Sequence, residues 1–182
     1  MSTEATTDTE PRATQTHVIE RDGERVDLVL RPIEPRDNDA ALALAERISS
    51  FGPPEWRDAE QLRRVDRDTL RKAIEDDGPD RLIVVAAVDA QVIGLMHATC
   101  LEDYYTRRSN AHLADLVVDA AWAGHGIGSL LMQRAEAWAR ARGDDWLSLS
   151  VFPQNEGAVR LYERSGFRPD IARYVKPIKP AT

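Results

Sequence analysis

The chain has 182 residues, which is room for one domain with a substantial core but not comfortably for two. Its hydrophobic share of 42% and charged share of 30% are typical of a soluble globular protein and exclude wholesale disorder. A formal net charge of −7 argues against a nucleic-acid partner. The longest apolar run, Leu82 to Val88, is too short to cross a membrane. With one cysteine and no secretory signal at the N-terminus, we expect a cytoplasmic protein.

The N-terminal part is expected to contain a tail, a strand and two helices. Residues 1–17 are rich in Thr and Glu with few apolar side chains, so we predict a disordered tail there and a single domain over 18–182. Alternating apolar residues over 26–30 predict a strand that Pro32 ends. One helix should follow an N-cap at Asp37 or Asn38. A second should span 55–77, with apolar positions at Leu62, Val65, Leu70, Ala73 and Ile74.

The middle of the chain predicts a hairpin, a central strand and a long helix. Two apolar runs, 82–88 and 92–101, are joined by a short polar turn and predict a β-hairpin. Apolar residues over 112–118 then predict a strand covered on both faces. From Ile127 the apolar side chains recur every three or four positions, which predicts an amphipathic helix that Gly143 ends. The polar positions expected on its solvent side are Gln133, Arg134, Glu136 and Arg140.

A glycine-rich turn, Gly124 to Gly128, joins the central strand to this helix. Glycines let the backbone approach a ligand closely, and a helix N-terminus concentrates unpaired N–H groups, so the turn is suited to hold a phosphate. It differs from a dinucleotide-binding turn because Ser129 stands in place of the third glycine, and no acidic residue ends the next strand. A Walker loop is disfavoured because the turn contains no lysine.

A second block follows the strand predicted over 146–151. Asn155 is suited to cap a short helix and Gly166 to end it, which places Tyr162 on the same helical face as Asn155. On residue types alone, a capping asparagine and a packing tyrosine explain both positions.

Together the two segments resemble the GNAT acyltransferase superfamily, over roughly residues 28–167. The glycine turn matches the motif R/Q-x-x-G-x-G/A at Gly126 and Gly128, although Ala123 stands where the family has Arg or Gln. The second block matches N-x-x-A-x-x-x-Y-x-x-x-G-F at Asn155, Ala158, Tyr162, Gly166 and Phe167. The resemblance implies an α/β (α+β) GNAT fold. Its mixed, mostly antiparallel twisted sheet would have six or seven strands and about four flanking helices, with the central strands splayed at a bulge.

The resemblance also implies an activity, the transfer of an acetyl group from acetyl-CoA to a primary amine by direct attack in a ternary complex. Tyr162 would protonate or hydrogen-bond the departing sulfur. Main-chain groups at the end of the central strand would bind the pantetheine arm and the acyl carbonyl, with Val118 N–H as the favoured oxyanion donor. The positions implied in cofactor binding are Leu116, Val117, Val118, Ala123, Gly124, His125, Gly126, Ile127, Gly128, Ser129 and Asn155.

An alkylammonium acceptor has a pKa of about 10.4, so a base is useful at neutral pH. Asp115, two residues before Val117, is the candidate base, and a paired structural aspartate is the equally weighted alternative. Relatives that acetylate ribosomal proteins carry a catalytic Glu where this chain has Ser150, which argues against that activity. His97, His112 and Cys100 lack zinc-ligand spacing, so no metal is expected.

Two other functions stay open from the sequence. One is a non-catalytic acyl-CoA-binding or regulatory module with the same fold, because function resides in the site and not in the fold. The other, more remote, is a Rossmann oxidoreductase. The acceptor could be a small-molecule or a protein amine, with no nucleic-acid or membrane partner expected. A homodimer is conceivable because dimers are frequent in the superfamily.

Overall fold

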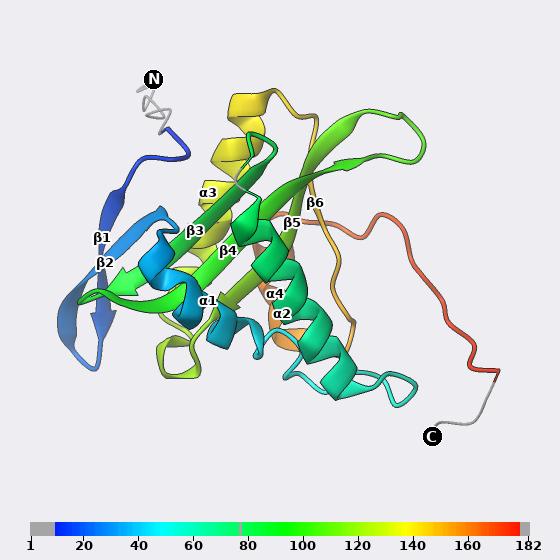
Figure 1. Ribbon diagram of the computed structural model, residues 1–182, viewed down its shortest axis with the longest axis horizontal. Helices are drawn as coiled ribbons and strands as arrows, with labels where there is room; N and C mark the ends of the chain where they lie inside the picture. The colour runs from blue at the N-terminus through cyan, green and yellow to red at the C-terminus, as the bar shows by residue number, and fades with distance from the viewer. Residues whose placement is uncertain (1–9, 77, 179–182) are drawn as a thin grey trace.

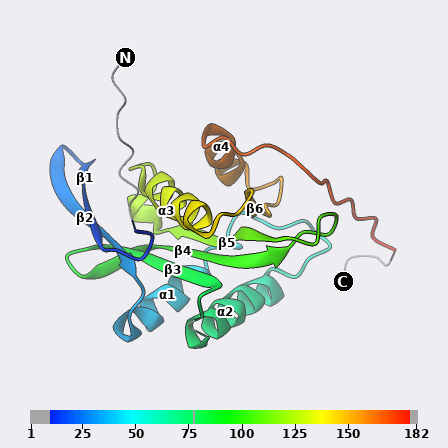
Figure 2. The same cartoon turned by 90° about the horizontal axis from the view of Figure 1, so that it is seen from above.

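The computed structural model describes residues 10–76 and 78–178. One mixed sheet of six strands runs through it, with the strands side by side in chain order. Helices α1 and α2 cover one face, and α3 covers the other, with α4 on the α3 side near β6 (Figure 1, Figure 2). The strands are β1 (Gln15–Arg21), β2 (Glu24–Pro32), β3 (Arg81–Val88), β4 (Gln91–Glu102), β5 (Ser109–Val118) and β6 (Leu147–Leu149). The helices are α1 (Asn38–Ala45), α2 (Ala59–Glu75), α3 (Ile127–Arg142) and α4 (Glu156–Arg164), with short 3-10 turns η1 (Pro35–Asp37) and η2 (Ala120–Trp122).

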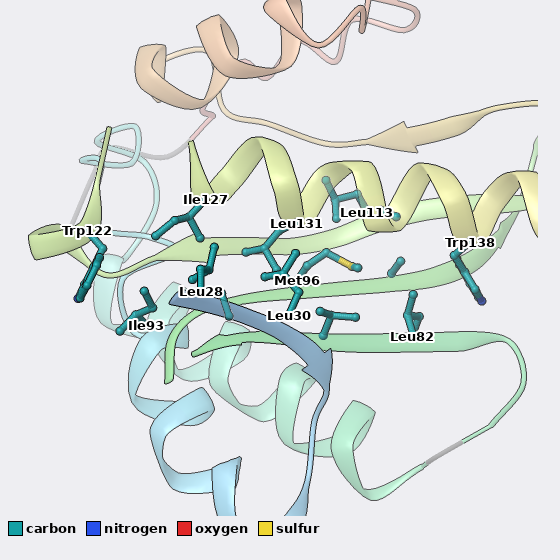
Figure 3. Close-up of a cluster of buried hydrophobic side chains, with 14 of the residues drawn as sticks. Leu28, Leu30, Leu82, Ile93, Met96, Leu113, Trp122, Ile127, Leu131 and Trp138 are labelled. Carbon is teal, nitrogen blue, oxygen red and sulfur yellow. The ribbon is translucent and has the colours of Figure 1, made fainter. Parts of the chain in front are cut away.

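Two hydrophobic cores, one on each face, hold the sheet. Figure 3 shows the larger core, in which Met96 and Leu113 of the sheet pack against Leu131 of α3. The smaller core lies under α1 and α2 and includes Leu95, Val117 and Leu70. Each fully buried leucine contributes roughly 1.5–3 kcal/mol, so the sheet from β2 to β5 is firmly positioned. A mixed sheet with helices on both faces confirms the expected fold, and all neighbouring strands are antiparallel except β5 and β6.

A bulge interrupts β5 where the sequence resemblance predicted one. Opposite β4, His97 pairs with Asp115 but Ala98 pairs with Leu113, so Ala114 is the extra residue. An extra residue changes which side chains face which side. Leu113 therefore belongs to the core under α3, whereas Asp115 lies with Val117 toward the side of α1 and α2.

Three features of the structure differ from the sequence expectations. Strand β1 begins at Gln15, inside the segment expected to be a tail; residues 1–9 of that segment lie outside the described residues. Arg134 was expected to face solvent, yet it is buried and donates to the carbonyls of Glu10, Pro11 and Ala13. The second helix was expected to begin at residue 55, but α2 begins at Ala59. Asp58 caps it by accepting hydrogen bonds from the N–H groups of the first turn.

Residues 168–178 form no helix or strand, and the sheet of the described residues has six strands. No helix in the described ranges has the length and apolar character that a membrane crossing requires.

Candidate active site

The sheet opens between β5 and β6 just beyond the bulge. The two strands pair in parallel only from Ala111 to Leu113 on the β5 side. From Ala114 to Val118, β5 keeps its partner β4 but has no strand neighbour on its other edge in the described chain. In an antiparallel pair, alternate residues point their N–H and C=O groups away from the partner. Leu116, Val117 and Val118 therefore lie on the stretch of β5 that presents main-chain groups to this opening.

The glycine turn lies at the end of the same strand. Gly124 and Gly126 adopt left-handed conformations with φ of 85° and 78°, which a side chain would strain. The Gly126 carbonyl accepts the N–H groups of Ser129 and Leu130 at 3.0 and 3.1 Å, and so starts α3. The N–H groups of residues 124–128 have no acceptor among the described residues. Five adjacent unpaired donors at a helix N-terminus are suited to bind an anion.

Three other residues predicted in this turn have defined places. His125 is held against the chain, since its Nδ1 donates to the Ala123 carbonyl at 3.0 Å. Ala123 closes η2 by donating its N–H to the Ala120 carbonyl at 3.2 Å, so its N–H is not available to a ligand. Gly128 packs against α4, where a Cβ would lie 3.2 Å from the Leu161 side chain. Ile127 contributes its side chain to the core.

Asp115 and His97 form a buried pair on the α2 side of the opening. His97 Nδ1 lies 2.8 Å from Asp115 Oδ2, and the two residues are 3% and 8% exposed. With the carboxylate as acceptor, Nδ1 carries the hydrogen of this bond. The other ring nitrogen, Nε2, is buried without a partner in the described chain. Asp115 Oδ1 has no hydrogen-bond partner among the described residues, so one oxygen is held and the other is available.

A second carboxylate, Asp66 of α2, lies within electrostatic range of Asp115. Burial and then the charge of Asp115 raise the pKa of Asp66, while a hydrogen bond from the Ser49 hydroxyl opposes the rise. The sequence interpretation placed Val65 on the buried face of this helix, but Val65 is half exposed and Asp66 faces inward. The signal was present: Asp66 lies four residues from both Leu62 and Leu70, on one helical stripe.

Tyr162 and Asn155 lie on α4, on the other side of the opening. The Asn155 side chain caps the helix by accepting the Ala158 N–H at 3.3 Å, as its residue type predicted. The Tyr162 ring packs against Phe167 with centroids 5.9 Å apart, and its hydroxyl makes no hydrogen bond with the described part of the chain. Burial and then the charge of Asp115 raise the pKa of Tyr162. Tyr162 is therefore protonated at neutral pH and can donate.

A cavity of about 550 Å³ lies between α3 and α4, beside the glycine turn. Its lining residues are Ser129, Gln133, Glu136, Arg164, Ser165 and Gly166. Arg164 is the cationic side chain of this set. Asp115 is not among its lining residues, and Ser129, in the first turn of α3, is the lining residue next to the glycine turn in sequence.

No group of three His, Cys, Asp or Glu side chains that could hold a metal occurs among the described residues. His97 bonds to Asp115, and His112 Nδ1 lies 2.9 Å from the Ser148 hydroxyl oxygen. The pKa of His112 is lowered, mainly because its ring is buried.

A bulged strand, a glycine turn and a tyrosine-bearing helix are the features that the sequence resemblance implied for a GNAT acyltransferase. The sequence model of the Acetyltransferase (GNAT) family matches residues 41–167, well over half of the chain. The chain belongs to this family.

Curated relatives and solved structures agree with that assignment. The chain is 33% identical over 97 residues to L-amino acid N-acetyltransferase AaaT of Escherichia coli, covering 50% of this chain and 56% of that protein. It therefore spans little more than half the length of that relative.

Two solved structures share the fold. The GCN5-related N-acetyltransferase of Ralstonia eutropha superimposes with a TM-score of 0.66 at 24% identity, covering 83% of this chain and 98% of that one. The aminoglycoside N-acetyltransferase AAC(6')-Iy in complex with CoA gives a TM-score of 0.63 at 14% identity, covering 91% and 97%.

Proposed function

We propose that this protein is an N-acetyltransferase that moves an acetyl group from acetyl-CoA to a primary amine by direct attack in a ternary complex. The observation that carries the proposal is the opening beside β5: it has free main-chain donors at one end, Asp115 on one side and α4 with Tyr162 on the other. Membership of the acetyltransferase family and the CoA complex of a protein with the same fold support it.

In this proposal the cofactor runs along the opening. The diphosphate binds the N–H groups of residues 124–128, where the positive end of the α3 dipole adds to the attraction. The cavity between α3 and α4 then holds the nucleotide end, with Arg164 as its cationic partner for a phosphate. The pantetheine arm lies along Leu116, Val117 and Val118, and Val118 N–H donates to the thioester oxygen.

The chemistry needs a proton acceptor and a proton donor. Asp115 Oδ1 takes a proton from the ammonium group of the acceptor, and the neutral amine nitrogen then attacks the thioester carbonyl. His97 acts as a positioning residue, because its hydrogen bond holds the other oxygen. As the C–S bond breaks, Tyr162 donates its proton to the thiolate and the second proton lost by the nitrogen restores the tyrosine, so the products are an amide and CoA thiol.

The acceptor is a cation before it reacts, and the site is acidic on that side. Asp66 and Asp115 lie within electrostatic range of one another and would attract an ammonium group. Small-molecule and protein amines both fit this description. The related proteins differ here, since one is named for L-amino acids and another for aminoglycosides. A cytoplasmic location, where acetyl-CoA is made, belongs to the same proposal.

The test is release of CoA thiol from acetyl-CoA when an amine panel is added. The proposal predicts amine-dependent release, measured against a reaction without amine because Cys100 can itself react with a thiol reagent. Binding of acetyl-CoA without release by any amine would favour the non-catalytic acyl-CoA-binding module instead.

A further inference from the structure

An aromatic contact joins two segments that are far apart in sequence on the acceptor side of the opening. Phe51 lies in the loop between α1 and α2, and Phe152 lies between β6 and α4. Their ring centroids are 5.2 Å apart, with the ring planes tilted by 31°. Both residues are only partly buried, so each still presents apolar surface. The contact links the helical layer of α1 and α2 to the segment that leads into α4.

The loop that carries Phe51 is tied to the acidic side of the site. Ser49, two residues earlier, is buried, and its hydroxyl donates to Asp66. Asp66 lies within electrostatic range of Asp115, the proposed base. Phe51 therefore follows closely, along the chain, the residue that holds one of the two carboxylates expected to attract the acceptor.

Phe152 comes just after the point where the sheet opens. Leu149, the last residue of β6, pairs with Leu113, and beyond this pair β5 has no strand neighbour on that edge in the described chain. Three residues after Phe152, Asn155 caps α4, the helix that carries Tyr162. Phe152 thus stands between the last paired residue of β6 and the helix that bounds the opening.

Backbone geometry holds the loop between α1 and α2 in place. Gly52 takes a left-handed conformation with φ of 83°, and Pro53 and Pro54 follow with their restricted φ angles. The Arg57 N–H donates to the Pro54 carbonyl at 2.8 Å. The Arg57 guanidinium carbon lies 5.4 Å from the centre of the Phe152 ring, and this side chain makes no hydrogen bond or ion pair with the described residues. A positive charge therefore already lies beside the two rings.

We propose that the acceptor is a primary monoamine with a large apolar or aromatic group, which packs against Phe51 and Phe152. Its nitrogen lies on the side of Asp66 and Asp115. This inference rests on the proposed acetyltransferase activity and specifies its substrate class. Apolar area covered by the rings adds to the binding free energy. A second ammonium group in the same place would lose hydration without gaining a carboxylate partner, and it would lie near the charge of Arg57.

The first test compares amines with the wild-type chain, by release of CoA thiol from acetyl-CoA. Hexylamine and 1,5-diaminopentane have the same number of non-hydrogen atoms and differ in whether the chain ends in a methyl or an ammonium group. We expect kcat/KM to be about tenfold higher for hexylamine. It should also be higher by about tenfold or more for 2-phenylethylamine than for ethylamine.

Two kinds of failure are distinguishable in this test. A preference for the diamine, or equal kcat/KM for ethylamine and 2-phenylethylamine, would overturn the substrate class and leave the acetyltransferase activity standing. Binding of acetyl-CoA with no release by any amine would contradict the activity itself, and the substrate class with it.

Phe51→Ala tests the aromatic contact. The kcat/KM for 2-phenylethylamine should fall about tenfold, mainly through KM, whereas ethylamine has little apolar area to lose and should react almost as before. Phe51→Leu keeps an apolar side chain and should restore much of the loss. Tyr105→Ala, which changes an exposed tyrosine between β4 and β5, is the matched control. Equal losses with both amines would make Phe51 a structural residue and overturn its part in selecting the acceptor.

Arg57→Gln tests the positive charge beside the rings. It should raise kcat/KM for 1,5-diaminopentane roughly threefold and change that for hexylamine little, because only the diamine meets a like charge. Arg25→Gln, which changes an exposed arginine of β2, is the control. The affinity for acetyl-CoA, measured by calorimetry, should stay at the wild-type value in all these variants and so report an intact fold. An unchanged ratio between the two amines in Arg57→Gln would overturn the role given to this charge.

Discussion

The sheet from β2 to β5 and the corner formed by β6 and α4 differ in how completely they are packed. β3 is almost wholly buried, and helices cover both faces of the sheet there. β6 has three paired residues, and no residue of α4 is buried. The closely packed part fixes the main-chain groups of β5, whereas the thinly packed corner leaves room beside them. The candidate site lies along the boundary, where a rigid strand faces a gap.

The largest expected effect concerns stability and tests this contrast directly. Leu131→Ala removes a fully buried side chain from the core under α3 and should lower the free energy of unfolding by about 2–5 kcal/mol. Leu149→Ala in β6 removes a partly buried one and should cost less than half as much. Denaturant unfolding of the two variants measures both. Equal losses would mean that the corner is as well packed as the core.

The next effect is on chemistry. Asp115→Asn keeps an acceptor for His97 but removes the proton acceptor, and should lower kcat by about 10²–10⁴-fold with little change in the KM for acetyl-CoA. Asp39→Asn, which alters an exposed aspartate of α1, serves as the control. His97→Gln should give a smaller loss and an altered pH profile. Normal turnover by Asp115→Asn would make Asp115 the paired structural residue that the sequence also allowed.

Tyr162→Phe should lower kcat by about 10²-fold because the thiolate then leaves without a placed proton donor. Since the pKa of Tyr162 is raised, wild-type activity should not fall through ionisation of this tyrosine below its ordinary pKa of about 10. Steady-state kinetics of Tyr162→Phe beside Tyr105→Phe, an exposed tyrosine, provides the comparison. Unchanged turnover would remove Tyr162 from the mechanism.

The smallest effect is a dependence of stability on pH. Burial lowers the pKa of His112 in the folded chain, so the unfolded chain binds a proton first as the pH falls. Its contribution is present above the unfolded pKa of about 6.5 and is lost as pH falls toward the folded value. Between pH 7.5 and 5.5, Tm of the wild type should therefore fall more than Tm of His112→Gln. Parallel curves for the two proteins would show that His112 titrates alike in both states.

Local patterns allowed much of the fold to be predicted. Gly126, Gly143 and Asn155 each have a role set by the few residues around them, and the structure confirms the helix start, the helix end and the cap. The hairpin and the central strand follow from apolar runs, and they too are confirmed.

Features that depend on distant contacts could not be predicted. The pairing of His97 with Asp115 follows from the register of two strands and a bulge. Arg134 is buried because the segment at residues 10–13 folds over it and accepts its hydrogen bonds. Five of the seven residues of β1 are polar, so its composition resembled a tail. Residues 168–178 have strand-like side chains but pair with no strand among the described residues.

The central claim is that the N–H groups of residues 124–128 hold the diphosphate of coenzyme A and direct its thioester along β5 toward Tyr162. An amide NMR titration of the full chain with acetyl-CoA tests it most directly. The largest shifts should fall on Gly124 to Gly128 and on Leu116 to Val118, with Gly126→Ala weakening the affinity. Saturable binding that leaves these amides unmoved, or no binding at all, would contradict the account.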